Sequence, residues 1–380
     1  MNVLFVTLFP LENNTSVTIS NYGLLMGLHA LGYEVTILEP SMSRAGTYRC
    51  DYDLSMFTIE RIPELYFNEL RRWGNKTFVE RVQRKWHKEF DFLDFTAPML
   101  KYADKVAVEG KKYDIIISTS DPKTTHLFVK RLIERGLQYG RWIQHWGDPM
   151  NGDITRKNCY PDRIIQWYER KIIEKADRIV YVSPFTTEMQ RKAYPDMVDK
   201  IAFVPLPCIE SENERSSSKN GSEHLKLAYM GDYFSKVRNI MPLYEACQSM
   251  PEVELTIAGI SDLKLQSTGN ITVLPRVPHS QAVQIEEQAD VSVSVCNIRG
   301  TQIPGKLYYS AAMQKHLMVL IDGDDPEKIK TYLERFNRYE LAENNVESIK
   351  TAIKELQGKP CDYQCPEELK PLNVIKAILD

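Results

Sequence analysis

Residues 296–322 read Cys-Asn-Ile-Arg-Gly-Thr-Gln-Ile-Pro-Gly-Lys-Leu-Tyr-Tyr-Ser-Ala-Ala-Met-Gln-Lys-His-Leu-Met-Val-Leu-Ile-Asp. The apolar run Val291–Val295 precedes this stretch, and a second apolar run, Leu317–Ile321, closes it. Between them, Pro304 suits the first turn of a helix, where a missing N–H costs nothing. The order predicts a strand, a loop, a helix that extends to about Lys315, and a second strand, which is one repeat of an α/β fold.

The predicted start of this helix offers a place for a phosphate group. A loop that opens onto a helix N-terminus presents free N–H groups and the positive end of the helix dipole, and Lys306 adds a full charge. An ordinary strand-to-helix turn with a surface lysine fits the same residues. The stretch alone leaves both interpretations open.

Length and composition limit the classes of protein that fit. A chain of 380 residues favours two domains, and a net charge of -3 provides no general attraction for nucleic acid. Seven cysteines are scattered without a Cys-x-x-Cys pair, which predicts reduced thiols in a cytoplasmic protein and no zinc site. No apolar run approaches the roughly 18 residues of a membrane span.

The chain begins with a strand, helix and strand pattern. Asn2–Leu8 is a nearly continuous apolar run, helically spaced apolar residues follow, Gly32 closes the helix, and Tyr33–Leu38 is the next strand. This is the start of a doubly wound sheet. Because no Gly-x-Gly-x-x-Gly follows the first strand, a dinucleotide cofactor at this turn is not expected.

A polar stretch marks the domain boundary. Residues 208–224 are Ser, Glu, Asn, Lys and Gly with almost nothing apolar, and the alternation of strands and helices restarts after them. We therefore expect two Rossmann-like, doubly wound domains that face a central cleft. The first covers 1–207, the second covers 208–364, and a helix within 365–380 follows a polar crossing.

Two strand ends in the first domain carry candidate site residues. In open α/β sheets ligands bind outside the carboxyl ends of the strands. His145 and Asp148 follow such an end, so both are expected to face a cleft. For Asp148, which precedes a proline, plain turn chemistry is the alternative. For His145 the alternative is a structural histidine at the end of a strand.

In the second domain, cations follow two strand ends. One loop, Gly231–Asn239, contains Lys236 and Arg238, and the other ends at Lys306. If these three side chains converge, they can bind a pyrophosphate, which is a good leaving group once its charge is neutralised. The alternative is that the three side chains are separate surface cations, each surrounded by solvent.

Residues 61–88 are rich in Arg, Lys and aromatic residues. One interpretation is an amphipathic surface that rests on anionic lipid and gives a peripheral membrane contact. The other is a helix that packs on the domain and exposes a basic face to solvent.

Taken together, the motifs resemble glycosyltransferases of the GT-B fold, and among them the retaining family 4. Four stretches carry the resemblance: Glu169–Ser183, Lys200–Pro207, Leu227–Asn239 and Ile303–Ile321. A fifth, Trp142–Pro149, resembles a segment of the capsule and lipopolysaccharide branches. The resemblance covers nearly the whole chain. It implies that the first domain binds the acceptor, that the second binds the nucleotide sugar, and that the C-terminal helix, 365–380, packs back on the first.

The resemblance implies transfer of a sugar, with retention, from a nucleotide-diphosphate donor to a glycan or lipid-linked acceptor, and a role in surface polysaccharide synthesis. It implies no metal, because protein cations and N–H groups bind the diphosphate. The implied diphosphate-binding residues are Arg238, Lys236, Lys306, Gly231 and Gly305. The implied nucleoside- or sugar-binding residues are Thr301, Gln302, Ile303, Pro304 and Tyr309. On the acceptor side, the loop residues are Asn14, Thr15 and Ser16, and the catalytic residues are His145 and Asp148.

The sequence departs from the family pattern at three places. The arginine of the donor loop falls at Asp232, and the paired glutamates fall at Thr301 and Tyr309. The glycine pair after the first strand is replaced by residues 13–16. These departures motivate an alternative, a non-catalytic binding or scaffold subunit of a glycan assembly complex. A sugar-nucleotide epimerase of the same fold is a third hypothesis.

Overall fold

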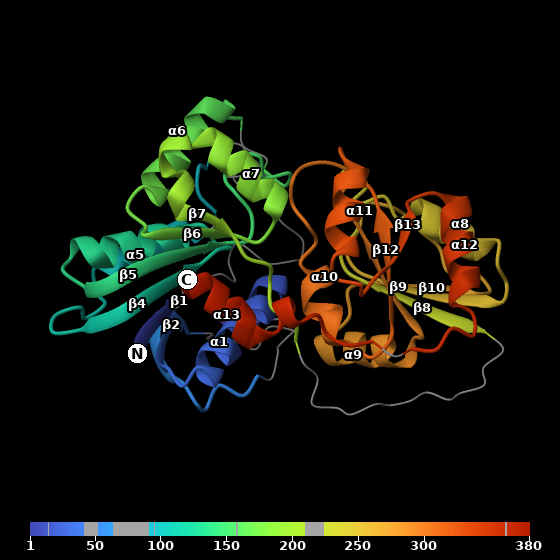
Figure 1. The fold of residues 1–380 in the computed structure, drawn as a ribbon, viewed down its shortest axis with the longest axis horizontal. Coiled ribbons are helices and arrows are strands. Elements are labelled where there is room, and N and C mark those ends of the chain that lie inside the picture. The colour runs from blue at the N-terminus through green and yellow to red at the C-terminus, as the bar shows by residue number, and fades with distance from the viewer. Residues whose placement is uncertain are drawn as a thin grey trace, which may run out of the picture. The chain divides into compact units, whose positions relative to one another are not determined.

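The computed structural model describes residues 1–13, 15–41, 52–63, 91–94, 96–156, 159–209, 224–361 and 363–380. These residues form two compact units (Figure 1). Unit 1 takes the described residues up to Pro205 together with Leu372–Asp380, and unit 2 takes Leu206–Pro371. Within the described residues, the chain passes from unit 1 to unit 2 after Pro205 and returns after Pro371.

Unit 1 contains a parallel sheet of seven strands in the order β3-β2-β1-β4-β5-β6-β7. The central strands β1 and β4 are apolar along most of their length, as expected for strands covered on both faces. Their bounds are β1 Asn2–Val6, β2 Glu34–Pro40, β3 Thr58–Ile62, β4 Lys112–Thr119, β5 Gln138–Trp146, β6 Arg178–Tyr181 and β7 Ile201–Phe203.

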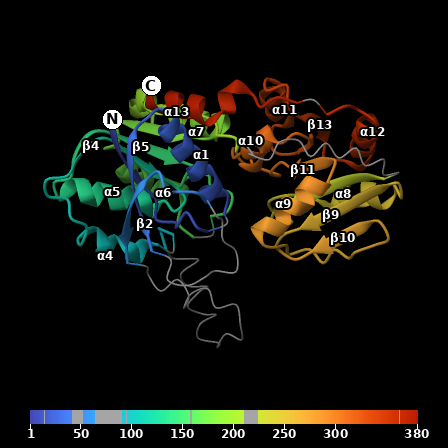
Figure 2. The same ribbon diagram turned by 90° about the horizontal axis from the view of Figure 1, so that it is seen from below.

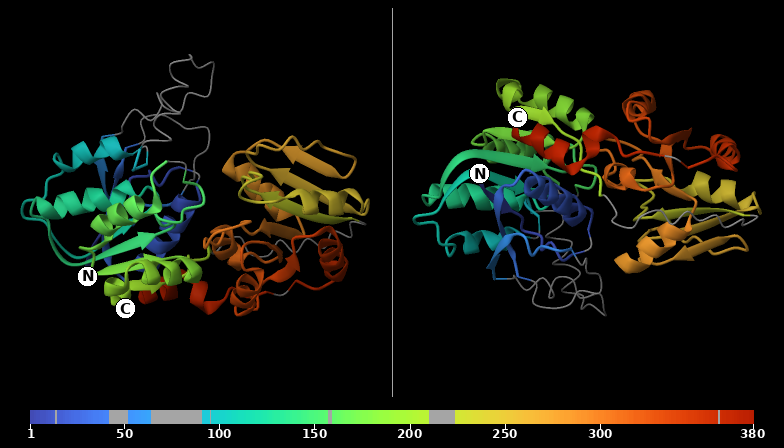
Figure 3. Two further views of the ribbon diagram at one scale, coloured as in Figure 1. Left: turned by 90° about the horizontal axis from the view of Figure 1, so that it is seen from above. Right: turned by 60° about the horizontal axis from the view of Figure 1, so that its bottom comes forward.

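Helices cover both faces of this sheet. One face packs on α5 and α6, through Phe128, Leu132, Ile165 and Ile172. The other packs on α1 and α13, which lie side by side in Figure 3. The helices are α1 Ser16–Ala30, α4 Leu100–Ala103, α5 Thr124–Glu134, α6 Asp162–Ile173, α7 Pro184–Ala193 and α13 Pro371–Leu379, with 3₁₀ turns η1 Ala97–Met99 and η2 Pro195–Lys200.

The C-terminal helix α13 is an integral part of unit 1. Its residues Val374, Ile375 and Ile378 are buried in the same core as α1. Arg178 donates to the carbonyl of Ala377 at 2.9 Å, and Arg141 donates to the carbonyl of Leu379. Cations at a helix C-terminus satisfy carbonyls that lack an intrahelical partner and complement the helix dipole.

Unit 2 contains a parallel sheet of six strands in the order β10-β9-β8-β11-β12-β13. The strands are β8 Leu225–Met230, β9 Val253–Ala258, β10 Ile271–Leu274, β11 Val291–Val295, β12 His316–Ile321 and β13 Glu340–Glu343. The order reverses between β8 and β11. Neighbouring connections there run to opposite faces, which opens the sheet at the carboxyl ends of these two strands.

The helices of unit 2 also lie on two faces. α8 and α12 pack together on the face that carries Val291, Val293 and Val295, and α9 lies across the strands from them (Figure 1). Ser292, on the opposite face of β11, accordingly bonds to Glu286 of α9. The helices are α8 Met241–Gln248, α9 His279–Gln288, α10 Lys306–Tyr309, α11 Pro326–Glu334 and α12 Val346–Leu356, with η3 Ser310–Ala312 and η4 Glu367–Leu369.

The predicted fold class, two doubly wound α/β units, is confirmed. The length predicted for the helix after Pro304 was wrong, because α10 and η3 end at Ala312. The buried Arg338 donates to the carbonyls of Ala311 at 2.7 Å and of Lys315 at 3.1 Å, and also to the carbonyl of Met313. Carbonyls bound by this guanidinium are not available to continue the helical ladder.

Candidate functional site

The first candidate site lies at the switch point of unit 2. One loop, 231–240, follows β8, and the other, 296–305, follows β11. The backbone N–H of Ile298 donates to the carbonyl of Val237 at 2.9 Å, so the two loops are in direct contact. Every cation that the sequence assigned to the diphosphate lies on one of these loops or next to it.

Arg238 is the cation with the most suitable surroundings. Its Nε donates to Oδ1 of Asn297 at 3.1 Å, and its Nη1 donates to the carbonyl of Asp232 at 3.2 Å. Asn297 is buried and donates through Nδ2 to the carbonyl of Gln302 at 2.9 Å. These partners are all neutral groups, so they orient the guanidinium without cancelling its charge. Asn297 was not identified from the sequence.

Lys306 has a different environment from the one expected. Its ammonium lies 2.5 Å from a carboxylate oxygen of Glu286 and donates to the carbonyl of Met230 at 3.1 Å. Glu286 is buried and also accepts from Ser292. The charge of Lys306 is therefore largely balanced within unit 2, and one of its three N–H donors remains for a ligand. Gly305 is the N-cap of α10 and Lys306 its first residue, where backbone N–H groups have no intrahelical acceptor and can donate to an anion.

The other predicted nucleoside- or sugar-binding residues lie in the same loop. Gln302, Ile303 and Pro304 are buried, and Thr301 is partly exposed. Both polar atoms of the Gln302 side chain are buried without a partner in the described part of the chain. A buried amide without partners is costly, so a ligand that pairs with it gains free energy on binding.

Tyr309 is partly buried beside the cations. Burial and the nearby Glu286 raise the pKa of its phenol, while Arg238 and Arg276 act in the opposite direction. The hydroxyl therefore stays protonated at neutral pH and can donate one hydrogen bond. A glutamate at this position would instead accept two bonds.

Two glycines bring the loops after β8 and β9 close together. The N–H of Gly231 donates to the carbonyl of Ala258 at 2.9 Å. A Cβ on Gly259 would lie 2.0 Å from the carbonyl oxygen of Gly231, so only glycine fits there. A Cβ on Gly231 would meet only the Tyr229 hydroxyl, at 3.9 Å, so one side of Gly231 remains open. Lys236, in the same loop, is exposed.

A further cation, Arg276, lies near this loop and was not identified from the sequence. It follows β10, and its Nη1 is 3.9 Å from Oδ2 of Asp232. Asp232 stands where the resemblance places an arginine. The acidic residue at position 232 thus has a basic partner from a different strand, a pairing that no local motif indicates.

The second candidate site lies at the carboxyl ends of β4 and β5 in unit 1. Strand alternation turns His145 to the face of Ile143, toward the core that contains α1 and α13, and leaves it only 2% exposed. Thr119 is its neighbour across the sheet. Burial lowers the pKa of His145 to about 4, and neither ring nitrogen has a partner in the described residues. His145 thus lies at the carboxyl end of β5 as a buried, neutral imidazole whose two ring nitrogens are unpaired within the described residues.

Asp148 lies in a group of charges that the sequence did not reveal. Lys123, at the start of α5, is 3.0 Å from both Asp121 and Asp153. Burial opposes the charge of Lys123, but Asp121, Asp153 and Asp148 outweigh it and hold the pKa of the ammonium well above its usual value. Asp148 is thus a third carboxylate whose charge acts on this partly buried cation.

Glu169 of α6 holds the loop that carries Asp148 through hydrogen bonds to its backbone. This buried carboxylate accepts the backbone N–H groups of Met150 at 2.6 Å and Asn151 at 3.3 Å, and the hydroxyl of Tyr194 at 2.8 Å. Burial raises the pKa of Glu169. Glu169 thus holds the position of the loop between β5 and α6.

The remaining predictions concern the N-terminal segments. Thr15 is the N-cap of α1, where its hydroxyl accepts the N–H of Thr18, and Ser16 is the first residue of that helix. Asn14 lies outside the described residues, as do 64–88 of the predicted membrane segment. Arg61, at its start, pairs with Glu12 and with the buried Glu39.

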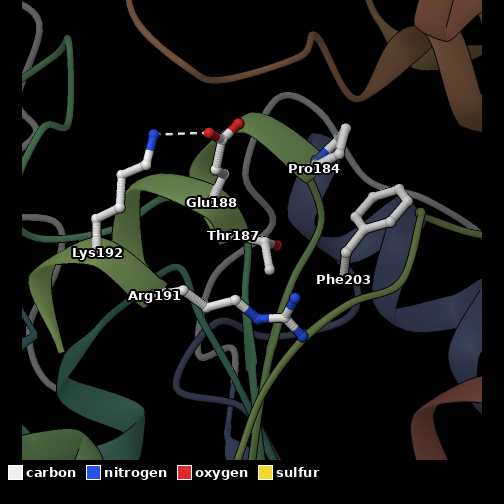
Figure 4. A pocket seen from close by; sticks show the side chains of 6 residues that line it. All are labelled: Pro184, Thr187, Glu188, Arg191, Lys192 and Phe203. Atoms are coloured by element: carbon white, nitrogen blue, oxygen red, sulfur yellow. Dashed lines mark hydrogen bonds and ion pairs between the residues drawn. The ribbon is translucent and has the colours of Figure 1, made fainter. Parts of the chain in front are cut away.

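A hollow of about 430 Å³ lies between α7 and β7 (Figure 4). It is lined by Pro184, Thr187, Glu188, Arg191, Lys192 and Phe203. Glu188 and Lys192 form an ion pair at 2.6 Å, and Arg191 donates to the carbonyl of Ile201. Because these charges already have partners, we do not assign a site here.

Within the described residues, no group of three or more His, Cys, Asp or Glu side chains could bind a metal ion. The same residues contain no helix with the length and apolarity needed to cross a membrane.

Known protein-family models do not match this sequence, and neither do curated proteins. Solved structures resemble this chain over its full length. The catalytic domain of starch synthase IV from Arabidopsis thaliana, bound to ADP and acarbose, is 11% identical, with a TM-score of 0.60 and coverage of 100% of this chain and 95% of that one. Alr3699/HepE from Anabaena, in complex with UDP and glucose, is 9% identical, with a TM-score of 0.58 and coverage of 100% and 97%.

A glycosyltransferase from Rickettsia africae is 12% identical, with a TM-score of 0.55 and coverage of 100% of this chain and 93% of that one. The structural neighbours are proteins of the GT-B fold. The chain adopts the GT-B fold. At these identities the likeness establishes the fold alone. The roles of residues in this GT-B chain therefore rest on the geometry of its two sheet edges.

Proposed function

We propose that this chain is a glycosyltransferase that moves a sugar from a nucleotide-diphosphate donor, bound to unit 2, to an acceptor bound to unit 1. The observation that carries the proposal is Arg238. It lies at the switch point of the sheet, and neutral partners orient it without cancelling its charge. An oriented guanidinium of this kind is suited to a diphosphate, which it can bind through two parallel hydrogen bonds.

On the donor side, Arg238 neutralises the diphosphate, and the amides of Gly305 and Lys306 donate hydrogen bonds to it. Lys306 contributes its third N–H, and Glu286 fixes the position of its ammonium. Lys236 adds charge at long range from its exposed position. Neutralising the diphosphate makes it a better leaving group, because negative charge develops on it as the glycosidic bond to phosphate breaks. No metal is needed for this step.

The rest of the donor is bound by the 301–309 region. Gln302 pairs with a polar group of the sugar or nucleoside through its buried amide. Tyr309 donates from its protonated hydroxyl where a carboxylate would accept. Thr301, Ile303 and Pro304 complete this part of the site.

On the acceptor side, we assign Asp148 and His145 to orienting the reacting groups, and the loop of Thr15 and Ser16 to the acceptor. Asp148 lies near the Lys123 ammonium, and its carboxylate can accept a hydrogen bond from a sugar hydroxyl. His145 stays neutral at physiological pH because burial lowers its pKa to about 4. A neutral imidazole offers one donor and one acceptor.

Three further features belong to the proposal. Transfer proceeds with retention, as the resemblance to family 4 implies, and the leaving phosphate helps to remove the acceptor proton. The acceptor is a glycan or lipid-linked sugar of a surface polysaccharide. The protein acts in the cytoplasm, at the inner face of the membrane. The lack of a Cys-x-x-Cys pair or a regular cysteine framework in the sequence supports a reducing compartment.

A non-catalytic binding subunit is the second candidate. The observation that favours it is Tyr309, which cannot accept two hydrogen bonds from a ribose. Such a protein would bind the donor but would neither transfer nor hydrolyse its sugar. A sugar-nucleotide epimerase would instead change the configuration of the donor sugar without an acceptor.

A thermal-shift screen over UDP-, GDP-, ADP- and dTDP-sugars tests the proposal, because ligand binding raises apparent stability by mass action. We expect one nucleotide class to raise the Tm of the wild type and to have no effect on Arg238→Ala. Mass spectrometry of the reaction with that donor then distinguishes transfer or hydrolysis from epimerisation and from binding alone. If no nucleotide sugar shifts the Tm, or if both proteins respond equally, the assignment is wrong.

A further inference from the structure

Arg276 occupies a place at the donor edge of unit 2 that the proposed function has not used. It lies in the loop after β10, and β10, β9 and β8 are neighbours in the sheet, of which Figure 2 shows β10 beside β9. Because all strands are parallel, the residues that follow β10 emerge at the same edge as the loop after β8. Arg276 therefore reaches the donor loop from the side of the sheet opposite to β11.

Its contact there is with Asp232. Nη1 of Arg276 is 3.9 Å from Oδ2 of Asp232, while Oδ1 of Asp232 accepts the N–H of Ile260 at 2.9 Å. The carbonyl of Asp232 accepts from Arg238 at 3.2 Å. The two arginines thus contact the same residue, Arg238 at its backbone and Arg276 at its side chain.

A second observation places Arg276 close to the site. Both Arg238 and Arg276 lower the pKa of Tyr309, against the larger effects of burial and Glu286. Tyr309 belongs to the loop and helix after β11, on the far side of β8 from β10. The charge of Arg276 therefore reaches Tyr309, on the other side of the loop after β8.

The charge of a nucleoside diphosphate is not fully matched by Arg238 and Lys306, which leaves a role for another cation at the site. A nucleoside diphosphate carries more than one negative charge, whereas Glu286 already balances Lys306. The hydrogen-bond partners of Arg238 among the described residues are neutral groups. The Arg276–Asp232 contact is long and its side chains are 42% and 34% exposed, so solvent weakens this ion pair. A guanidinium binds phosphate oxygens through two charge-assisted bonds, which are stronger.

We propose that Arg276 is a second diphosphate-binding arginine, held by Asp232 and transferred to the diphosphate when the donor binds. The arginine that the family resemblance places at position 232 is thereby replaced by one from a different strand. Asp232 acts as a positioning residue, because it holds Arg276 near the site and competes with the anion for it. This inference rests on the proposed function.

Isothermal titration calorimetry of the full chain tests the inference. The probes are UDP, GDP, ADP, dTDP and inorganic pyrophosphate, and the variants are Arg276→Ala, Arg276→Lys and Asp232→Asn. We expect Arg276→Ala to weaken binding of the preferred diphosphate by about 10- to 100-fold, the range for a lost hydrogen bond to a charged group. Arg276→Lys should recover only part of the affinity, because lysine cannot make the bidentate contact.

Asp232→Asn separates this role from a structural one. Asparagine keeps the Oδ1 acceptor for Ile260 but releases Arg276, so binding should be unchanged or tighter. If the pair only stabilised the loop, Asp232→Asn and Arg276→Ala would weaken binding together. Circular dichroism and thermal melts verify that each variant is folded.

Arg335→Ala is the matched control. Arg335 is 47% exposed on its side chain and pairs with Glu368 at 2.6 Å, but it follows α11, which runs back toward the opposite edge of the sheet. It should leave affinity unchanged. If the wild type binds a diphosphate and Arg276→Ala binds it equally well, this inference is wrong and the proposed function stands. If the wild type binds no probe, both are wrong.

Discussion

The Nε of Arg238 donates to Oδ1 of Asn297 at 3.1 Å, and this bond joins two loops 59 residues apart in the sequence. Asn297 is buried and also donates to the carbonyl of Gln302. One amide side chain therefore sets both the direction of the guanidinium and the path of the loop that leads to α10. The electrostatics of the donor edge depend on a residue that carries no charge.

We predict that Asn297→Ala weakens donor binding by about tenfold, because Arg238 loses the acceptor that orients it. Calorimetry with the preferred nucleotide measures the change. The variant should also lower the free energy of unfolding by about 1–3 kcal/mol, because the carbonyl of Gln302 loses its partner.

Asn270→Ala is the control for this prediction. Asn270 donates to the carbonyls of Cys247, Met250 and Val253 at the amino edge of the same sheet. Its loss should lower stability without changing affinity. Equal affinities in the two variants would show that Asn297 has a structural role only.

Gly259→Ala should disturb the donor loop. The new Cβ would lie 2.0 Å from the carbonyl oxygen of Gly231, so the loop after β8 or the end of β9 must shift. We expect a lower midpoint in urea unfolding and weaker donor binding. Gly269→Ala is the matched control, since nothing lies within 4 Å of its Cβ and its φ is not positive. A normal affinity for Gly259→Ala would mean that the position of Gly231 does not matter for binding.

His145 should make the stability of the protein depend on pH. Its pKa is lowered to about 4 in the folded chain, whereas the unfolded value is about 6.5. Between these values the unfolded state binds more protons. The free energy of unfolding therefore falls as the pH falls from about 6.5 to about 4, by about 3 kcal/mol for this group.

Urea unfolding of the wild type and His145→Gln between pH 7 and pH 4 measures this contribution. Burial and the nearby His145 also lower the pKa of His126, so the difference between the two proteins includes the change that His145→Gln makes at His126. The wild type should lose more stability than the variant over this range. Parallel curves would contradict the lowered pKa of His145.

Ile375→Ala should destabilise unit 1. The side chain is fully buried in the core shared by α1 and α13, and such truncations cost about 2–5 kcal/mol. Lys376→Ala, an exposed change on the same helix, should change the free energy of unfolding by less than about 0.5 kcal/mol. Denaturant unfolding with both variants checks the prediction, and equal stabilities would place α13 outside the core.

Much of the fold could be predicted from the sequence, because buried parallel strands appear as apolar runs. β1, β4 and β12 are examples. Two strands gave no such signal. β3 reads Thr-Ile-Glu-Arg-Ile and β13 reads Glu-Leu-Ala-Glu, and both are edge strands, which need less apolar surface.

The candidate sites were less predictable, because their contacts join residues far apart in the sequence. Arg238 and Lys306 follow strand ends and could be found. The partner of Lys306 is Glu286, on a helix before the adjacent strand, and the partner of Asp232 is Arg276, from the loop after β10. Neither position has a local pattern that sets it apart from a surface residue.

The place of α13 in unit 1 has a consequence for how the protein is made. A ribosome synthesises residues 1–205 first, then unit 2, and only afterwards Val374, Ile375 and Ile378, which fill the core beside α1. Domains generally fold as they emerge, and the N-terminal one usually folds first. Here the order is reversed: unit 2 can be complete while the first half of the chain still exposes the apolar surface that its last helix will cover.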